Sequence, residues 1–345
     1  MKKHLIILAA GFLSITGMAQ SEKTPYQTKT FANETIKEVD SRTQGGSIDI
    51  AGVNPSEARI EVYITSNNSR NNDLSKDEIA QRLKEDYDLT ISVSGGKLTA
   101  RSQAKRNFTN WKRALNVSFK IFVPQNVSTD LSTSGGSISL NNLSGTQDFR
   151  TSGGSLSVTK VSGKINGQTS GGSIDVSDCK DDIDLETSGG SIDAENCTGK
   201  IKLNTSGGSL NLNNLKGNVR ATTSGGSVDG KKVDGELYAH TSGGNVSLRE
   251  LSCSLETSTS GGNIDVEIKE LRDYVKIHNS SGQINISIPA NKGVDLRLSA
   301  DKIRTGTLTG FSGSVEDHQV NGKINGGGIP ITADAGSGRI TLSFK

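Results

Sequence analysis

The sequence has few large or reactive side chains. Aromatic residues are 4% of the 345 positions, and there are only five prolines, three cysteines and four histidines. So little aromatic bulk, together with 41 glycines, argues against a thick globular core and favours a thin one. The histidines and cysteines do not form a set of zinc ligands in the pattern, which argues against a zinc site. The chain also lacks a P-loop, a Gly-x-Ser-x-Gly elbow and a His-Glu-x-x-His motif, so the sequence predicts no enzyme.

A charge excess of either sign and a long apolar run are also missing. The chain has 39 basic and 37 acidic residues, and two of the basic ones, Lys2 and Lys3, lie in a predicted leader. The remaining chain is therefore neutral, which argues against nucleic acid as a partner. No stretch approaches about 18 apolar residues, so we expect no transmembrane span in the mature chain.

The leader has the features of a bacterial secretory signal peptide over residues 1–19. Lys2 and Lys3 precede an apolar run at 5–15, and Gly17 and Ala19 are the small residues of a cleavage site. No cysteine follows that site, which argues against a lipoprotein. We expect an exported protein, located in the periplasm, on the outer surface or in the medium.

An 18-residue repeat dominates the rest of the chain. Counted from the residue after each Gly-Gly pair, usually serine, apolar residues fall at offsets one, three and six, then mostly at ten and twelve, as in Leu210, Leu212, Leu215, Val219 and Ala221. Spacings of two predict two short strands per repeat. We expect the glycines to lie in turns that need a positive φ or leave no room for a Cβ. The pairs begin at Gly135, Gly153, Gly171, Gly189, Gly207, Gly225, Gly243 and Gly261.

This period predicts an all-β, single-domain β-solenoid with 18-residue rungs. Crossovers between parallel strands are overwhelmingly right-handed, so we expect a right-handed β-helix. The offsets do not repeat at six, unlike those of left-handed hexapeptide coils. After the signal peptide, the pattern divides the chain into an N-terminal cap at 20–130, the regular solenoid at 131–268 and irregular C-terminal rungs with a cap at 269–345.

The caps contain isolated copies of the motif and an insertion. Copies lie at 44–50, 279–284 and 335–340. Between the first copy and the array, Ser75 and Glu78 form a capping box that predicts a short helix. Strands are expected at 89–93, 98–101 and 117–123.

A basic segment follows the predicted helix and is the candidate ligand-binding region. Its cations and aromatic rings suit an acidic glycan, such as lipopolysaccharide or teichoic acid. The alternative, which we favour, is a solvated hairpin whose tryptophan covers the end of the core. The candidate residues are Lys105, Arg106, Trp111, Lys112 and Arg113.

Asp175 and Asp193 are the candidate metal ligands. They lie at the same outward offset of adjacent rungs, and neighbouring carboxylates attract a cation such as calcium. The other residues at this offset are mostly serine and asparagine, which favours a solvated face instead. A polysaccharide-degrading enzyme is expected only if this pair lines a groove opposite a basic residue. No other cofactor is expected.

Two cysteines also share an offset on adjacent rungs. Cys179 and Cys197 are expected about 4.8 Å apart between Cα atoms, just within disulfide range. Because in-register parallel neighbours make a strained bridge, we expect free thiols that fill an inward slot.

The chain resembles the bacterial putative adhesin family, first catalogued as a domain of unknown function, and the related head domain of autotransporter adhesins. The resemblance spans about residues 30–345 and rests on 119–124, the Thr-Ser-Gly-Gly-Ser repeats and the closing 325–328. It implies an exported β-solenoid without catalysis and supplies no site residues. The expected partners are an envelope polysaccharide, a host surface or another envelope protein. A periplasmic structural or stress-regulatory role is the alternative to adhesion.

Overall fold

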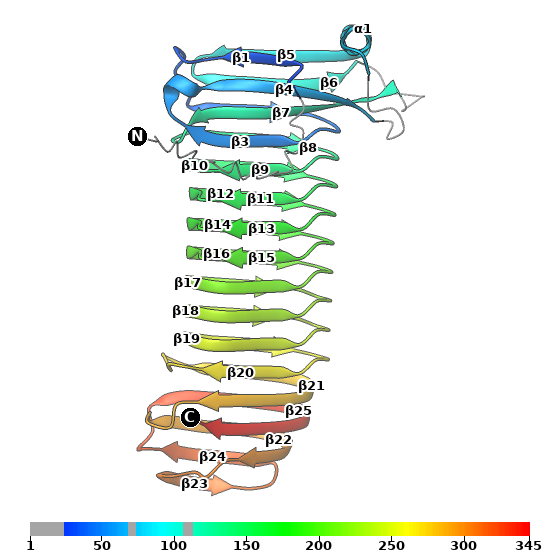
Figure 1. Cartoon of the computed structure of the whole chain (residues 1–345). Helices are drawn as coiled ribbons and strands as arrows, with labels where there is room; N and C mark the ends of the chain where they lie inside the picture. Colours follow the sequence, from blue (N-terminus) through cyan, green and yellow to red (C-terminus); the bar gives the residue numbers. More distant parts are fainter. Residues whose placement is uncertain (1–23, 68–73, 106–112) are drawn as a thin grey trace, which may run out of the picture.

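The computed structural model describes residues 24–67, 74–105 and 113–345, so the predicted signal peptide lies outside the described residues. The described chain forms a straight rod of stacked coils (Figure 1). Twenty-five strands make one continuous sheet. The predicted all-β solenoid is therefore confirmed.

Each regular rung contributes two strands, one on each side of a thin core. Successive rungs pair in parallel with a register of 18, as in Ile174 with Ile192 and Ile183 with Ile201. The first face comprises the strands that directly follow the Gly-Gly pairs: β9 (Ile138–Asn141), β11 (Leu156–Thr159), β13 (Ile174–Ser177) and β15 (Ile192–Glu195). The second face comprises β8 (Ser128–Thr133), β10 (Ser144–Thr151), β12 (Ser162–Thr169), β14 (Lys180–Thr187) and β16 (Thr198–Thr205). Further along, β17 (Leu210–Thr222), β18 (Val228–His240) and β19 (Val246–Thr259) continue round the corner into both faces.

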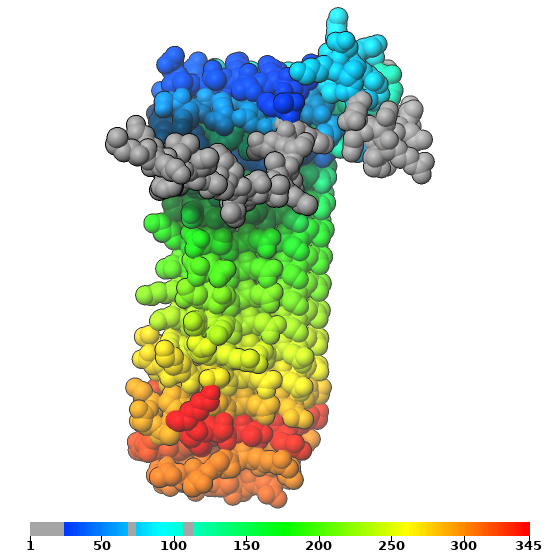
Figure 2. All heavy atoms as spheres, viewed as in Figure 1, coloured from blue at the N-terminus to red at the C-terminus, as the bar shows by residue number. Residues whose placement is uncertain are grey.

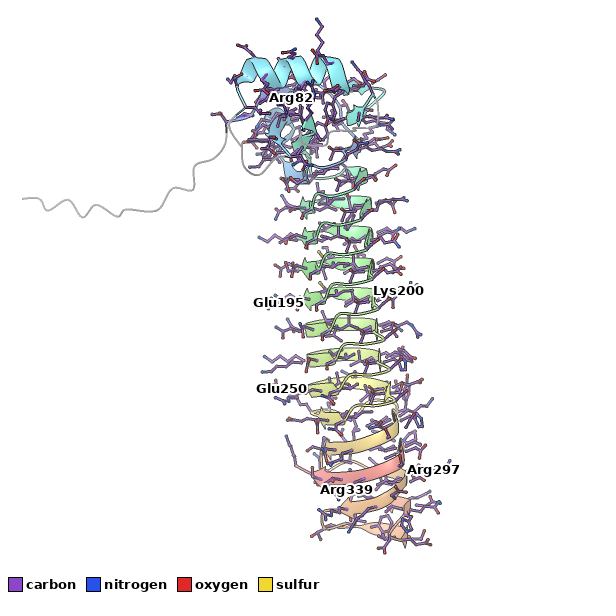
Figure 3. All side chains as sticks on the ribbon, turned by 90° about the vertical axis from the view of Figure 1, so that its right-hand side faces the viewer. Arg82, Glu195, Lys200, Glu250, Arg297 and Arg339 are labelled. Atoms are coloured by element: carbon purple, nitrogen blue, oxygen red, sulfur yellow. The ribbon has the colours of Figure 1, made fainter. Side chains whose placement is uncertain are left out.

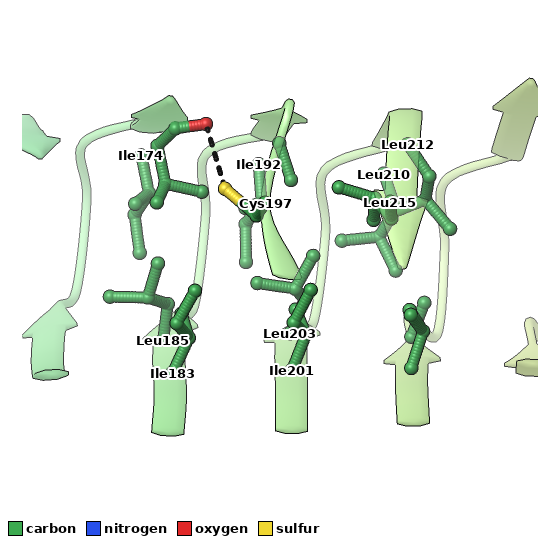
Figure 4. Close-up of a cluster of buried hydrophobic side chains, with 14 of the residues drawn as sticks. Ile174, Ile183, Leu185, Ile192, Cys197, Ile201, Leu203, Leu210, Leu212 and Leu215 are labelled. Carbon is green, nitrogen blue, oxygen red and sulfur yellow. Dashed lines mark hydrogen bonds between the residues drawn. The ribbon is translucent and has the colours of Figure 1, made fainter. Parts of the chain in front are cut away.

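The apolar offsets point inward, as the alternation predicts. Ile174 and Ile192 of the first face lie opposite Ile183 and Ile201 of the second, and all four are almost fully buried (Figure 4). Because one rung is only two layers of side chains thick, its core must be completed by the rungs above and below it.

The repeated threonine explains the Thr-Ser-Gly-Gly sequence. The buried Thr187 hydroxyl donates to the Gly172 carbonyl of the preceding rung at 2.8 Å and accepts from the Gly190 amide of its own rung at 3.3 Å. Each hydroxyl thus satisfies turn groups that would otherwise be buried without partners. The same arrangement recurs at Thr133, Thr151, Thr169, Thr205, Thr223, Thr241 and Thr259.

The two glycines of a pair have different steric roles. A Cβ on Gly190 would lie 2.2 Å from the Gly172 oxygen, whereas a Cβ on Gly189 would come no closer than 3.5 Å to any backbone atom. Neither glycine has a positive φ. The steric restriction therefore falls on the second glycine of each pair, and not on Gly135 and the other first glycines, which were the predicted structural turn positions.

The positive φ angles lie at the corner between the two strands instead. One residue per rung there has a φ between 53° and 58°: Asn142, Lys160, Asp178, Asn196, Asn214, Lys232 and Glu250. Three residues later, Gly145, Gly163, Gly199, Gly217 and Gly235 have φ between 102° and 127°. This corner, rather than the Gly-Gly turn, needs the left-handed backbone conformation.

The N-terminal cap surrounds the first motif copy. Its strands β2 (Glu38–Arg42) and β3 (Ile48–Val53) pair in parallel with the array, so residues 44–50 begin the solenoid. The predicted helix is α1 (Lys76–Asp86), and the Ser75 hydroxyl accepts from the Glu78 amide at 3.2 Å. The other elements are β1 (Gln27–Thr30), the short 3-10 helix η1 (Pro55–Glu57), β4 (Arg59–Ser66), β5 (Tyr87–Ser94), β6 (Lys97–Ala104) and β7 (Leu115–Pro124). No helix in the described ranges is long and apolar enough to cross a membrane.

The C-terminal cap inserts the last strand between two earlier ones. β25 (Ile329–Phe344) pairs in parallel with both β21 (Val275–Ile288) and β22 (Val294–Thr305). The motif copies at 279–284 and 335–340 consequently stack on each other, with Ile284 beside Ile340. The second face ends in the antiparallel strands β24 (Gln319–Ile324) and β23 (Phe311–Val315), and β20 (Ile264–Ile268) belongs to the first face.

Candidate functional site

The described cations of the predicted ligand-binding segment are engaged with the N-terminal cap. Lys105 Nζ donates to the Lys84 carbonyl at 2.7 Å and lies 3.7 Å from Asp88. Arg113 contacts the carboxylates of Glu85 at 3.0 Å and Asp86 at 3.2 Å.

These contacts hold both cations against acidic groups of their own chain, which reduces their capacity to bind an external anion. The hydrogen bond to Asp86 raises the pKa of Arg113 above its usual value. The other three candidates, Arg106, Trp111 and Lys112, lie outside the described residues.

The candidate metal pair lies on the first face, in register as predicted. Asp193 accepts a hydrogen bond from the Asn211 amide of the next rung, and the residue beside Asp175 on the other side is Ser157. Burial, followed by the charge of Asp193, raises the pKa of Asp175. Within the described residues, no group of three or more His, Cys, Asp or Glu side chains could hold a metal ion. The pair therefore offers two carboxylates without a third acidic ligand.

The three cysteines are buried free thiols. Cys179 and Cys197 fill the inward corner slot, where the Cys197 thiol points toward the Val176 carbonyl (Figure 4). The thiol contact with Cys197, followed by burial, raises the pKa of Cys179, and burial raises the pKa of Cys253 to about 12. All three thiols have a packing role, and the raised pKa values make Cys179 and Cys253 poor nucleophiles at neutral pH.

The second face carries a row of five polar side chains and one aromatic ring that was not predicted from the sequence. They alternate with buried neighbours and so point away from the core. Arg297, the last of them, projects on the same side of the rod as Lys200, opposite Glu195 and Glu250 (Figure 3). Strand pairing places the six residues of this row in one line along the rod axis. This second-face row consists of Arg220, Tyr238, Glu256, Lys276, Thr332 and Arg297.

Neighbouring side chains hold the aromatic rings of this region in place. The Arg220 guanidinium lies 4.0 Å from the centre of the Tyr238 ring. Beside the row, the Tyr274 hydroxyl donates to Glu236 at 2.8 Å, and Lys276 Nζ lies 5.0 Å from the Tyr274 ring centre. The hydrogen bond to Glu236 raises the pKa of Tyr274 to about 12. Fixed rings flanked by charges are suited to stacking against a planar or sugar-like surface.

The row ends in a hollow of about 590 Å³ on the outer side of β22, β24 and β25. Arg297 and Lys323 are exposed at its wall, and among the described residues neither forms an ion pair. The Oδ1 atom of Asp295 is buried beside them without a hydrogen-bond partner. The hollow therefore combines two free cations with an unsatisfied acceptor, and its volume falls in the range of small-molecule sites. Its lining also includes Leu296, Ser312, Asn321, Gly322, Pro330 and Thr332.

The sequence contained a signal for Tyr238 but none for the hollow. Tyr238 is the only aromatic residue at an outward offset between residues 131 and 268, so the repeat alignment could have revealed it. The hollow lies beyond the regular array, where antiparallel pairing of β22 with β24 brings Asp295 beside Lys323. No 18-residue offset encodes that pairing.

Comparison with known proteins finds a family similarity in the C-terminal half of the chain. No curated protein sequence matches this chain. A crystal structure of a putative cell adhesion protein from Clostridium sporogenes is 10% identical, with 92% of this chain and 98% of that chain covered and a TM-score of 0.20. A crystal structure of a putative adhesin from Bacteroides fragilis is 12% identical, with 92% and 96% covered and a TM-score of 0.25. At these scores the two likenesses support no conclusion on function.

The family match is shorter than the resemblance over residues 30–345. It begins within the regular array and includes the whole second-face row and the hollow. Residues 178–343 match the model of the Toastrack DUF4097 family, so the chain is similar to that family over this part of its solenoid.

Proposed function

We propose that this chain is an exported, non-catalytic cell-envelope protein that binds an extended polymer along its second face. The observation that carries the proposal is the register of the second-face row. Six side chains in line on adjacent strands span about 24 Å at a strand spacing of about 4.8 Å. Such a linear arrangement suits a ligand that is itself extended, because each strand contributes one contact.

The chemistry of the row favours an acidic polysaccharide. Arg220, Lys276 and Arg297 supply three cations against one carboxylate, that of Glu256, which lies 3.9 Å from Lys276 Nζ. The ring of Tyr238 supplies an apolar surface. The hollow adds the free cation of Lys323 and the unsatisfied acceptor of Asp295, which suits a sugar hydroxyl donor. Envelope polysaccharides and host-surface glycans both have this chemistry.

A non-catalytic role is supported by the environment of the Asp175–Asp193 pair. On the first face, its in-register neighbours are Ser157 and Asn211, so the strand pairing brings no basic residue to either side of the pair. Asp193 is also hydrogen-bonded to Asn211, which makes it a structural acceptor.

The test is a binding array of acidic and neutral polysaccharides and host-matrix proteins, probed with the purified chain in calcium and in chelator. We expect retention on polyuronate or another acidic glycan, unaffected by chelation. The variant Arg297→Ser/Lys323→Ser should bind at least about tenfold more weakly, equivalent to about 1.4 kcal/mol.

The control is Lys164→Ser/Lys200→Ser, which removes the same charge from the second face within the regular array. It should bind like the parent chain. Equal losses in both variants would show attraction to net charge alone and contradict the proposed site. No binding to any polymer would refute the adhesin role and favour the periplasmic structural one.

A further inference from the structure

The C-terminal end of the rod has an exposed strand edge. β23 is the last strand of the second face, and among the described strands it pairs only with β24 (Figures 1 and 2). The opposite end is protected: helix α1 packs against β5, and Lys29 Nζ donates to the Ile91 carbonyl of that strand at 3.2 Å. The two ends of the rod are therefore not equivalent.

The hydrogen-bonding pattern shows which groups of β23 are unpaired. The Glu316 amide donates to the Gln319 carbonyl at 2.8 Å, and the Asn325 amide donates to the Gly310 carbonyl at 3.1 Å. Because bonding alternates along an antiparallel strand, the even-numbered residues of β23 bond to β24. The N–H and C=O groups of Phe311, Gly313 and Val315 consequently point toward the open edge.

The side chains of β23 do not block this edge. The strand reads Phe-Ser-Gly-Ser-Val and contains no charge and no proline, the usual protective residues of an edge strand. Val315 is 55% exposed and is the only exposed large hydrophobic residue in the described part of the chain. An uncharged edge with an exposed apolar residue is a template for adding another strand.

We propose that two copies of this chain join end to end by antiparallel pairing of their β23 strands. The sequence is self-complementary about Gly313. The pairing sets Phe311 opposite Val315 of the second copy, Ser312 opposite Ser314, and Gly313 opposite Gly313. The backbone N–H and C=O groups of Phe311, Gly313 and Val315 then form about six hydrogen bonds across the interface.

The flanking charges are compatible with this register. Glu316 of one copy lies opposite Gly310 of the other, so no like charges face each other. Pairing also buries the inward-facing side chains of Val315 and the half-buried Phe311. The apolar core then continues from one rod into the next. A second copy therefore satisfies both the backbone groups and the apolar side chains of this end.

The test measures the mass of the full chain in solution by sedimentation or light scattering over a concentration series reaching several hundred micromolar. We expect a species of twice the 36.3 kDa chain mass to grow with concentration. Val315→Lys and Val315→Asp should each shift the dissociation constant upward by at least about tenfold, because an unpaired charge would lie at the interface. Ser157→Lys, an equal change of charge at an exposed position of the regular array far from this end, should leave it unaltered.

Three outcomes overturn the proposal: a monomer at every concentration, a dimer that both Val315 variants leave intact, or an equal loss in the Ser157→Lys control. Small-angle scattering adds a readout of shape, since end-to-end pairing doubles the length of the rod and side-by-side pairing does not. Circular dichroism confirms that each variant is folded. None of these measurements depends on polymer binding.

Discussion

Replacing Gly190 with alanine should destabilise the solenoid strongly, whereas the same change at Gly189 should not. The two glycines are adjacent in one turn, and neither has a positive φ, so alanine has no intrinsic conformational penalty at either position. The difference is the space available. The Gly190 Cβ would lie 2.2 Å from the Gly172 oxygen and 2.6 Å from the Ser173 nitrogen, which are backbone atoms of the rung before it.

The cost at Gly190 has two parts. Relieving the clash requires the two rungs to move apart by more than 1 Å, an overpacking strain of about 1–3 kcal/mol. That movement also stretches the bonds of the buried Thr187 hydroxyl to Gly172 and Gly190, and a buried group without its partner costs about 1–3 kcal/mol. We therefore expect a loss of about 2–6 kcal/mol.

At Gly189 the Cβ would make ordinary contacts at 3.5 Å. Alanine there also restricts the unfolded chain, so the expected change lies between zero and a stabilisation of about 1 kcal/mol. The assay is urea unfolding of both variants, with Gly207→Ala and Gly208→Ala as the equivalent pair one rung later. Since repeat proteins can unfold in parts, hydrogen exchange at the turn amides gives a local readout. Equal stability of Gly189→Ala and Gly190→Ala would refute the steric reasoning.

Three further predictions follow from buried groups. Thr205→Val should cost about 1–3 kcal/mol in urea unfolding because it leaves two turn groups unsatisfied, while Thr205→Ser should cost less; equal losses would contradict the hydrogen-bonding role. Without reductant, thiol titration should detect all three cysteines after denaturation and almost none in the folded protein at pH 7, where burial raises the pKa of Cys253 to about 12; a single thiol after denaturation would indicate a disulfide. Burial raises the pKa of Asp40, but its hydrogen bond and ion pair with Arg101, aided by other cations, lower it below 3.8 overall. Because the folded state binds this proton more weakly than the unfolded state, the stabilisation is present at neutral pH and lost as pH falls through that folded pKa. Arg101→Met should therefore cost about 1.5–3 kcal/mol at pH 7 and progressively less below pH 4, and a cost independent of pH would contradict it.

The array could be predicted from sequence because its structure repeats with the sequence. An inward slot filled by Ile174 in one rung is filled by Ile192 in the next, so the 18-residue period specifies both the strand register and the core. The steric difference between Gly189 and Gly190 could not be predicted in this way. Both residues repeat equally, and only the approach of the preceding rung separates them.

The caps were predicted less completely because their pairing is not periodic. Ser75 and Glu78 specify α1 through a local interaction, which is why the helix could be recognised. The insertion of β25 between β21 and β22 depends instead on contacts between segments more than 30 residues apart. The hollow exists only through this insertion and the return of β24, so its residues carried no recognisable spacing.

The position of the candidate site follows from the geometry of the repeat. In the array an outward side chain has in-register neighbours about 4.8 Å away on each side, which favours small polar residues such as Ser157 and Asn211. A bulky ring is accommodated where a neighbour can stack on it, as Arg220 does on Tyr238. Beyond β19 the rungs lengthen and the strand directions change, which opens space for Tyr274 and the hollow. In the proposed function, the earlier regular rungs act as a spacer, and the binding side chains extend from Arg220 on the last regular rungs to the hollow beyond them.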